Sequence, residues 1–166
     1  MMKNLWIMIS VLLLLFLGGC RTKELTAQQL EKMNLLKGAI EKPDFVFEPN
    51  SAQPMSGRLI SLSGTYSLKV VKDTVEAYLP YYGRAYVAPI NPSEGGIKFV
   101  STDFTYESSI RKKGNYKIKI TPKDVSMPDY QGLVLLLDVS TSGYGSLQVL
   151  LNNKQPISFS GTIQRK

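Results

Sequence analysis

The chain has 166 residues, with 20 lysines and arginines against 13 acidic residues and a formal net charge of +7. It contains no histidine and a single cysteine, Cys20. These absences exclude the Cys and His ligand sets of zinc sites, the Ser-His-Asp and Cys-His catalytic devices, and a disulfide within the chain. We expect no metal site and no cofactor. Because the lysines are spread along the chain and no recognition module is present, we also expect no nucleic-acid partner.

The first twenty residues have the order of a secretory signal. Lys3 precedes an apolar run from Leu5 to Leu17, and Leu17-Gly18-Gly19-Cys20 resembles the bacterial lipobox. As a helix the apolar run would span roughly 20 Å, short of the ~30 Å hydrocarbon core of a bilayer. The alternatives are an uncleaved membrane anchor and an ordinary signal peptide with a chance cysteine.

We therefore predict a lipoprotein signal peptide over residues 1–19 and lipid attachment to Cys20, with acyl chains such as palmitate. Residues 20–26 are then the lipidated cysteine and a tether, and the membrane is a partner through that lipid. Residues 27–166 are predicted as a single β-rich domain with an N-terminal helix. The expected location is the cell envelope, on the periplasmic side of the outer membrane. Surface exposure is the alternative, disfavoured because Arg21-Thr22-Lys23 carries no acidic residue.

A helix is predicted over about residues 27–40. Thr26 and Gln29 have the spacing of a capping box. Apolar residues then recur at helical spacing, at Leu30, Met33, Leu36 and Ile40. We expect this amphipathic stripe to pack on the domain, and a partner-binding helix is the alternative.

Period-two patterns begin after this helix. Phe45 and Phe47 flank Val46 in a short strand, and residues 50–57 have the composition of a loop. Residues 66–71 and 74–79 then form the clearest hairpin, joined by Lys72-Asp73. Because Lys-Asp is not the best sequence for a two-residue turn, a longer loop is the alternative. A two-residue turn sets these pairs: Val71 with Thr74, Val70 with Val75, Lys69 with Glu76, Leu68 with Ala77, and Tyr66 with Leu79.

A second hairpin joins residues 104–111 to residues 116–120. Gly114 is expected in the left-handed position of a three-residue loop. This register pairs Ile110 with Tyr116, Tyr106 with Ile120, and Glu107 with Lys119.

Three further strands are predicted, over residues 133–139, 146–151 and 157–163, of which the first is expected to be the most buried. Many short strands separated by turn signals are typical of all-β domains. The predicted fold class is mainly β: an antiparallel sandwich or barrel-like sheet of hairpins with one N-terminal amphipathic helix.

The densest unusual stretch runs from Tyr78 to Tyr86. It is rich in tyrosine and arginine, residue types that recognition surfaces use because they offer large contact areas with a polar tip. The candidate binding residues are Tyr78, Tyr81, Tyr82, Arg84 and Tyr86. The alternative is that these tyrosines close one end of the barrel.

Carboxylates offer the remaining route to catalysis. A glycoside hydrolase needs two acids about 5–10 Å apart. Asp103, Glu107 and Asp138 are available, but sequence spacing does not bring them together. Asp138 interrupts an apolar strand and is expected either on the solvent side or beside a basic residue; a buried acid with a shifted pKa is the alternative. No catalytic residue is assigned.

Several strings resemble the domain-of-unknown-function family 4251. They are Thr65-Tyr66-Ser67-Leu68-Lys69-Val70, Leu79-Pro80-Tyr81-Tyr82-Gly83-Arg84-Ala85-Tyr86, Gly95-Gly96-Ile97-Lys98-Phe99 and Ser158-Phe159-Ser160-Gly161-Thr162-Ile163. The resemblance covers roughly residues 27–164. It implies an exported protein, often a lipoprotein, of gut-type Gram-negative bacteria, and it implies no activity.

The function predicted from these features is a non-enzymatic, lipid-anchored module that binds an envelope protein or a glycan. An accessory structural subunit of an envelope complex and a carboxylate-based hydrolase are the alternatives.

Overall fold

The structure is a computed structural model that describes residues 26–86, 95–111, 114–125 and 130–165. The predicted signal peptide and Cys20 lie outside the described residues, as does most of the tether. Within the described part of the chain, no helix is long and apolar enough to cross a membrane. The elements are α2 (Ala27–Glu41), β1 (Asp44–Pro54), β2 (Ile60–Ser61), β3 (Ser67–Val71), β4 (Thr74–Leu79), β5 (Ile97–Ser101), β6 (Phe104–Ile110), β7 (Tyr116–Pro122), β8 (Val134–Val139), β9 (Tyr144–Leu151) and β10 (Lys154–Arg165).

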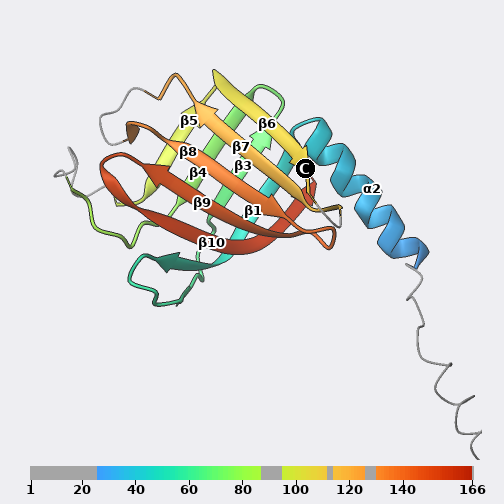
Figure 1. The fold of residues 1–166 in the computed structure, drawn as a ribbon, viewed down its shortest axis with the longest axis horizontal. Helices are drawn as coiled ribbons and strands as arrows, with labels where there is room; N and C mark the ends of the chain where they lie inside the picture. Colours follow the sequence, from blue (N-terminus) through green and yellow to red (C-terminus); the bar gives the residue numbers. More distant parts are fainter. Residues whose placement is uncertain (1–25, 87–94, 112–113, 126–129, 166) are drawn as a thin grey trace, which may run out of the picture.

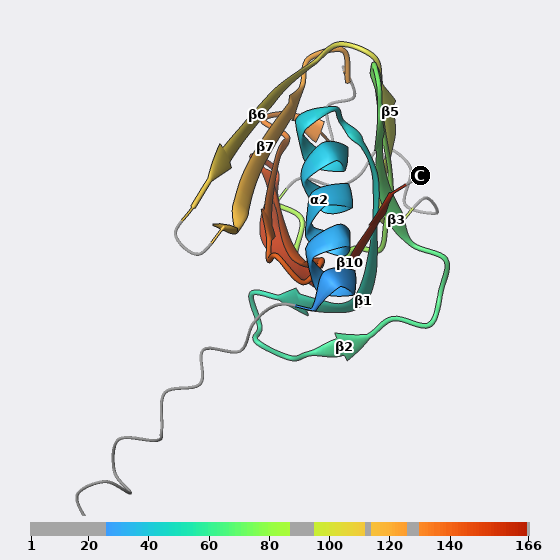
Figure 2. The ribbon, with the colours of Figure 1, turned by 90° about the vertical axis from the view of Figure 1, so that its right-hand side faces the viewer.

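These strands form one antiparallel sheet in the order β5-β4-β3-β1-β10-β9-β8-β7-β6, with β2 paired to β1 (Figure 1). The sheet curls into a nearly closed barrel, and α2 lies at one end, between its two halves (Figure 2). The predicted class, mainly β with a barrel-like antiparallel sheet and one N-terminal helix, is confirmed.

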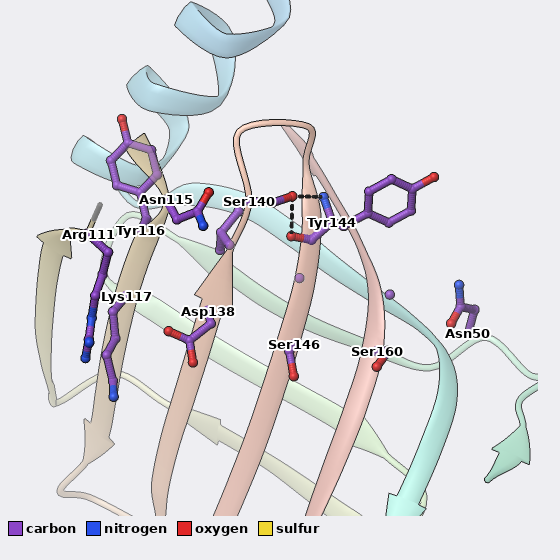
Figure 3. A pocket seen from close by; sticks show the side chains of 13 residues that line it. Asn50, Arg111, Asn115, Tyr116, Lys117, Asp138, Ser140, Tyr144, Ser146 and Ser160 are labelled. Carbon is purple, nitrogen blue, oxygen red and sulfur yellow. Dashed lines mark hydrogen bonds between the residues drawn. The ribbon is translucent and has the colours of Figure 1, made fainter. Parts of the chain in front are cut away.

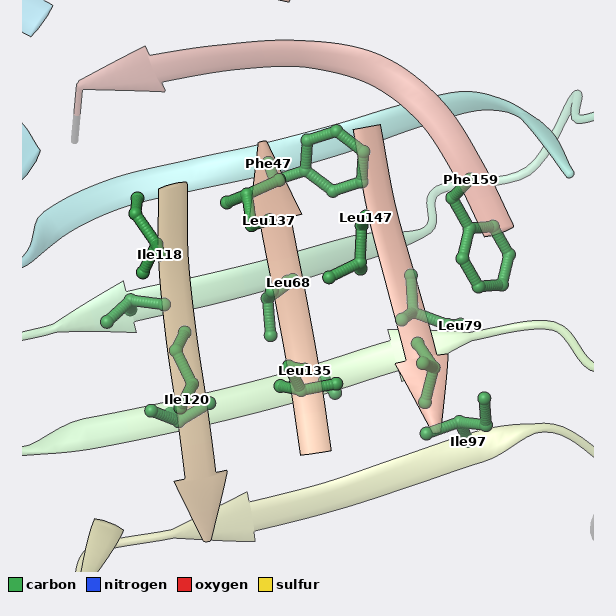
Figure 4. Packing of buried hydrophobic residues seen from close by; sticks show 14 of the residues in the cluster. Phe47, Leu68, Leu79, Ile97, Ile118, Ile120, Leu135, Leu137, Leu147 and Phe159 are labelled. Carbon is green, nitrogen blue, oxygen red and sulfur yellow. The ribbon is translucent and has the colours of Figure 1, made fainter. Parts of the chain in front are cut away.

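Strand alternation places every second side chain inside the barrel. The interior side chains come from both halves of the sheet and interdigitate (Figure 4). The largest fully buried ones are Phe45, Phe47, Phe159, Ile40, Leu68, Leu79, Ile97, Ile118, Ile120, Leu135, Leu137 and Leu147. Each such burial stabilises the fold by about 1.5–3 kcal/mol before conformational entropy is subtracted, so the inner faces dominate stability and the outer faces are available for other roles.

The first predicted hairpin is confirmed between β3 and β4 for its pairs from Leu68–Ala77 to Val71–Thr74. Lys69 and Glu76 lie opposite each other with their side chains 3.2 Å apart. Lys72 has a φ of 51°, the left-handed geometry that a tight turn imposes on a non-glycine residue. The predicted Tyr66–Leu79 pair is wrong, because Tyr66 precedes β3 and stacks on Tyr78 instead.

The second predicted hairpin is confirmed between β6 and β7, including the Tyr106–Ile120 and Ile110–Tyr116 pairs. Gly114 has a φ of 77°, as predicted for the left-handed position of the loop. Both hairpins are local, so turn length and side-chain alternation determine their registers.

β1 is longer than predicted, because it continues from Asp44 to Pro54 through the segment expected to be a loop. Its pairing with β10 shifts register between Pro49 and Ser51, where an irregularity accommodates a residue that has no N–H to donate. Gly161 of β10 crosses closely there: a Cβ on it would lie 2.1 Å from the carbonyl oxygen of Glu48. The composition of residues 50–57 predicts a loop, but residues 51–54 extend the strand because they pair with β10.

The prediction that residues 133–139 form the most buried strand is wrong, because β8 alternates between buried and less buried residues like the other strands. Leu135 and Leu137 are buried, Leu136 is half-buried, and Asp138 is exposed on the outer face. The strand pairs with β9 as predicted. Its outer face is uncovered because the sheet forms a single curled layer.

The predicted capping box begins α2. The N–H of Gln29 donates to Oγ1 of Thr26 at 3.4 Å, and the N–H of Thr26 donates to Oε1 of Gln29 at 3.0 Å. This reciprocal pair satisfies donors that a helix start leaves without partners.

Only the C-terminal end of α2 packs inside the barrel. Ala39 and Ile40 are buried, and the Tyr106 hydroxyl donates to the carbonyl oxygen of Ile40 at 2.8 Å. Burial raises the pKa of the Tyr106 phenol. Of the predicted stripe, Ile40 is buried and Leu36 packs against the core, whereas Leu30 is 52% exposed, so the expectation holds for the C-terminal half of the helix and is wrong at Leu30. The helix extends past the end of the barrel there (Figure 1).

The corner between β5 and β6 is held by Asp124, which follows β7. Its carboxylate accepts the N–H groups of Thr102 and Asp103 at 2.8 and 3.1 Å, and the hydroxyl of buried Ser101. These bonds, chiefly the one from Ser101, hold the pKa of Asp124 well below its ordinary value. Lys123 adds a backbone bond to the Asp103 carbonyl at 2.8 Å.

We call these hydrogen bonds to the Asp124 carboxylate the Asp124 clasp, and we expect them to make the free energy of unfolding depend on pH. A carboxyl group whose pKa is lower in the folded state contributes stability above its unfolded pKa of about 3.9, and this contribution is lost as pH falls toward the folded value. Asp124→Asn should therefore lower the free energy of unfolding at pH 7 and flatten its decline between about pH 5 and pH 3, measured by urea unfolding. Asp73→Asn, in the exposed β3–β4 turn, is the control. Equal pH profiles for wild type and Asp124→Asn would contradict the clasp.

Candidate functional site

The predicted tyrosine segment leaves the sheet after β4 and runs along the start of β10. Ala85 bridges to Lys154, and the N–H of Gln155 donates to the Arg84 carbonyl at 3.0 Å. The N–H of Tyr86 donates to the carbonyl of Asn153 at 2.8 Å. This pairing ties the segment to one end of the barrel, as the structural alternative predicts.

Tyr81 is the residue that fixes this segment. Its hydroxyl lies 2.9 Å from the carbonyl oxygens of both Arg84 and Gln155, and the N–H of Arg84 donates to Oε1 of Gln155 at 3.3 Å. Tyr81 is half-buried, and this burial raises the pKa of its phenol. Its hydroxyl is occupied by internal contacts, so Tyr81 acts as a latch.

Lys154 lies buried beside this latch, between two tyrosine rings. Its Nζ is 5.5 Å from the ring centre of Tyr81 and 5.6 Å from that of Tyr130. Both distances suit cation–π attraction, which compensates in part for removing the ammonium group from water. The hydroxyl of Tyr130 in turn accepts the N–H of Lys98 at 3.0 Å and donates to its carbonyl at 2.9 Å.

The other predicted binding residues are exposed in two places. Tyr78 lies on the outer face of β4, stacked on Tyr66 with ring centres 5.6 Å apart, and Nζ of Lys98 sits 5.1 Å from its ring centre. Tyr82, Arg84 and Tyr86 have exposed side chains on the segment after Pro80. Tyr81 contacts the Arg84 carbonyl, whereas Tyr78 packs with Tyr66 and Lys98 on β4. The role of the predicted residues in binding stays a prediction.

A groove beside the tyrosine pair has a volume of about 740 Å³. The ion pair between Lys69 and Glu76 forms part of its wall, so its central charges already satisfy one another. Residues 62–66 also line it.

A second hollow, which we call the outer trough, crosses the outer face of β7, β8, β9 and β10 (Figure 3). Its volume is about 590 Å³. Its polar residues are Asn50, Arg111, Asn115, Tyr116, Lys117, Asp138, Ser140, Tyr144, Ser146 and Ser160.

Strand register builds the trough. Lys117 on β7 lies opposite Asp138 on β8, which lies opposite Ser146 on β9, which lies opposite Ser160 on β10. The small serines leave space, and Arg111 lies side by side with Lys117 at one end (Figure 3). The sequence predicted which face of its hairpin Lys117 occupies, but only the strand order β7-β8-β9-β10 completes the row.

Tyr144 stands at the other side of the trough and is 65% exposed. The hydroxyl of Ser140 donates to the Tyr144 carbonyl at 3.2 Å, and the Tyr144 N–H donates back to Ser140 Oγ at 3.2 Å. These bonds fix the backbone of the turn and leave the ring facing outward (Figure 3).

The acids considered for catalysis are separated. Asp103 pairs with Lys123 at 3.5 Å, and Glu107 pairs with Lys119 at 3.9 Å. Asp138 is the single carboxylate among the described residues that line the trough. Within the described ranges, no three acids or cysteines come together as a metal site would require.

These features define a nearly closed antiparallel barrel with a helix at one end and a polar trough outside. The chain belongs to the family described as Domain of unknown function (DUF4251), whose model matches residues 27–163. It is similar to the crystal structure of a DUF4251 family protein from Bacteroides eggerthii, with 15% identity and a TM-score of 0.57. That match covers 81% of this chain and 88% of the other, and at this identity it shows the fold alone. No curated protein matches the chain.

Tyr81→Phe should remove the latch without removing the ring. We expect it to lower the free energy of unfolding by about 1 kcal/mol, because the hydroxyl bond to the part-buried Gln155 carbonyl is lost, whereas the Arg84 carbonyl keeps the N–H of Gln155 as a donor. Tyr82→Phe is the matched control and should change stability by less than about 0.5 kcal/mol, because that side chain is exposed. Urea unfolding measures both. Similar losses in the two variants would contradict the structural role of Tyr81.

Proposed function

We propose that this protein is a lipid-anchored component of the bacterial envelope whose barrel binds an anionic glycan in the outer trough. The observation that supports this proposal is which basic side chains form ion pairs and which do not. Four lysines elsewhere in the described part of the chain are in ion pairs: Lys37 with Glu41, Lys69 with Glu76, Lys119 with Glu107, and Lys123 with Asp103. Arg111 and Lys117 form no ion pair within the part of the chain that the structure describes.

The remaining chemistry of the trough suits a saccharide. The hydroxyls of Ser146 and Ser160 and the amide of Asn50 both donate and accept hydrogen bonds, as sugar hydroxyls require. The exposed ring of Tyr144 offers a face for stacking. A carboxylate or sulfate on the sugar would meet Arg111 and Lys117 through charge-assisted bonds.

A binding role fits these residues better than hydrolysis does. Hydrolysis by paired acids needs two carboxyl groups on either side of the bond that breaks. The described trough lining supplies only Asp138, while Asp103 and Glu107 are held by lysines. Asp138 would instead repel an anionic ligand and so limit its orientation.

The lipid anchor rests on the sequence before the barrel. The apolar run, the lipobox-like Leu17-Gly18-Gly19-Cys20 and the short stretch to Thr26 together support attachment close to a membrane. The described domain begins directly after this stretch, with its helix extending away from the barrel (Figure 1).

The binding proposal is tested with polygalacturonate as the anionic probe and dextran as the neutral one. The full chain should bind polygalacturonate, with affinity that falls as salt rises, and bind dextran more weakly. The double variant Arg111→Ala and Lys117→Ala should lose at least about tenfold in affinity, because each charge-assisted bond contributes about 1.5–3 kcal/mol.

The matched control removes the same charge elsewhere. Lys119→Ala with Lys123→Ala changes net charge equally but leaves the trough intact, and it should bind within about twofold of wild type. Asp138→Asn should bind more tightly. Equal loss in both double variants would reduce the binding to nonspecific attraction, and no binding by the wild type would refute an anionic glycan of this class.

The anchor is tested by metabolic labelling with an alkyne analogue of palmitate. We expect the label on the wild-type chain and its absence from Cys20→Ser, because the cysteine sulfur carries the diacylglycerol. Labelling that persists in Cys20→Ser, or no labelling of the wild type in a host that processes lipoproteins, would overturn the anchor.

A further inference from the structure

The outer edge of β6 presents backbone groups that the described structure does not pair. The Arg111 N–H donates to the Asn115 carbonyl at 2.6 Å, and the Lys123 N–H donates to the Asp103 carbonyl at 2.8 Å. Hydrogen-bonded pairs alternate along an antiparallel ladder, so odd-numbered residues of β6 bond to β7. Tyr106, Ser108 and Ile110 therefore turn their N–H and C=O groups away from β7.

At the opposite edge of the sheet, on β5, a side chain binds the outward-facing backbone groups. On β5, the Tyr130 hydroxyl binds both the N–H and the carbonyl of Lys98. No comparable side chain covers Ser108 or Ile110 within the described residues. Open edges invite pairing with another strand, and proteins that avoid it protect them with side chains, bulges or inward charges.

The side chains at this edge are exposed as well. Ile110 is 65% exposed although it lies on the inner face of its strand, and Ser108 is exposed on the same face. The ends of β6 and β7 flare away from α2, which leaves this inner face uncovered (Figure 2). An exposed isoleucine beside an unpaired edge is what a strand-to-strand contact would bury.

We propose that β6 pairs antiparallel with β6 of a second copy of this chain, about a twofold axis at Ser108. This register opposes Tyr106 to Ile110 of the partner subunit, and Ser108 to Ser108 of the partner subunit. Each opposed pair contains residues whose backbone groups point outward, so the ladder continues with correct hydrogen bonding.

The sequence of β6 is complementary to itself in this register. Tyr106 and the partner's Ile110 form an aromatic–aliphatic cross-strand pair, and the small serines meet at the axis. On the outer face, Glu107 has two diagonal neighbours across the axis, the partner's Arg111 and the partner's Glu107, so this face adds one attractive and one repulsive contact. The pairing therefore rests on the backbone groups and on the inner face. A shift by one residue would oppose even-numbered residues to odd-numbered ones, whose backbone groups already bond to β7, and would turn the matching side chains to opposite faces.

Site-specific cross-linking in native membranes tests the register. In Ser108→Cys, the two introduced cysteines face each other with Cα atoms about 5.5 Å apart, within disulfide range. Mild oxidation of membranes that contain the protein should give a linked dimer at twice the mass of the membrane-bound monomer. Ser146→Cys, an exposed serine on β9, and the wild type are the controls and should give at least fivefold less. Equal linking in Ser108→Cys and Ser146→Cys, or none in either, would overturn the pairing.

A proline variant tests whether the cross-link reflects backbone pairing of β6 or chance collision of two copies in the membrane. Ser108→Pro removes only an N–H that points away from β7, and an edge strand tolerates such a proline. Sedimentation of the full chain in mild detergent should show dimers for wild type and Ser108→Thr, and monomers for Ser108→Pro, with melting temperatures confirming that all three fold. Dimers of a folded Ser108→Pro, or a wild type that is monomeric at every concentration, would refute the proposal.

Discussion

The structure depends on how its sheet closes, because the two edge strands are neighbours in the chain. β5 and β6 are separated only by Thr102 and Asp103, yet they lie at opposite ends of the strand order. They turn a corner and do not form a backbone ladder with one another. Side chains therefore hold the barrel shut.

Three side chains share this task. Asp124 clasps the corner, Tyr130 bonds to the backbone of β5, and Tyr106 of β6 bonds to the end of α2. The bonded groups come from segments far apart in sequence. The sheet closes well enough to bury a continuous core, while its outer face carries the trough and β6 keeps an edge available to another strand.

The sequence predicts local features of this fold well and nonlocal ones poorly. The Lys69–Glu76 and Ile110–Tyr116 pairs and the capping box at Thr26 each depend on residues close in the chain, and all are confirmed. The length of β1 and the exposure of Leu30 depend on which surfaces meet, which spacing does not reveal. The candidate site follows the same rule. Tyr81 stands out in the sequence as a binding residue, but its hydroxyl bonds to the Gln155 carbonyl and holds the segment in place. The trough brings Lys117 and Ser160 onto one face through the strand order β7-β8-β9-β10, which no local sequence pattern reveals.

The most direct test of closure by side chains is hydrogen exchange at Lys98, compared between the wild type and Tyr130→Phe. The Lys98 amide faces away from β4, and its partner is the Tyr130 hydroxyl. The adjacent Phe99 amide faces β4 and bonds within the ladder. After correction for any change in global stability, Tyr130→Phe should accelerate exchange at Lys98 by at least about tenfold and leave Phe99 unchanged. Equal exchange at Lys98 in both proteins would contradict the account.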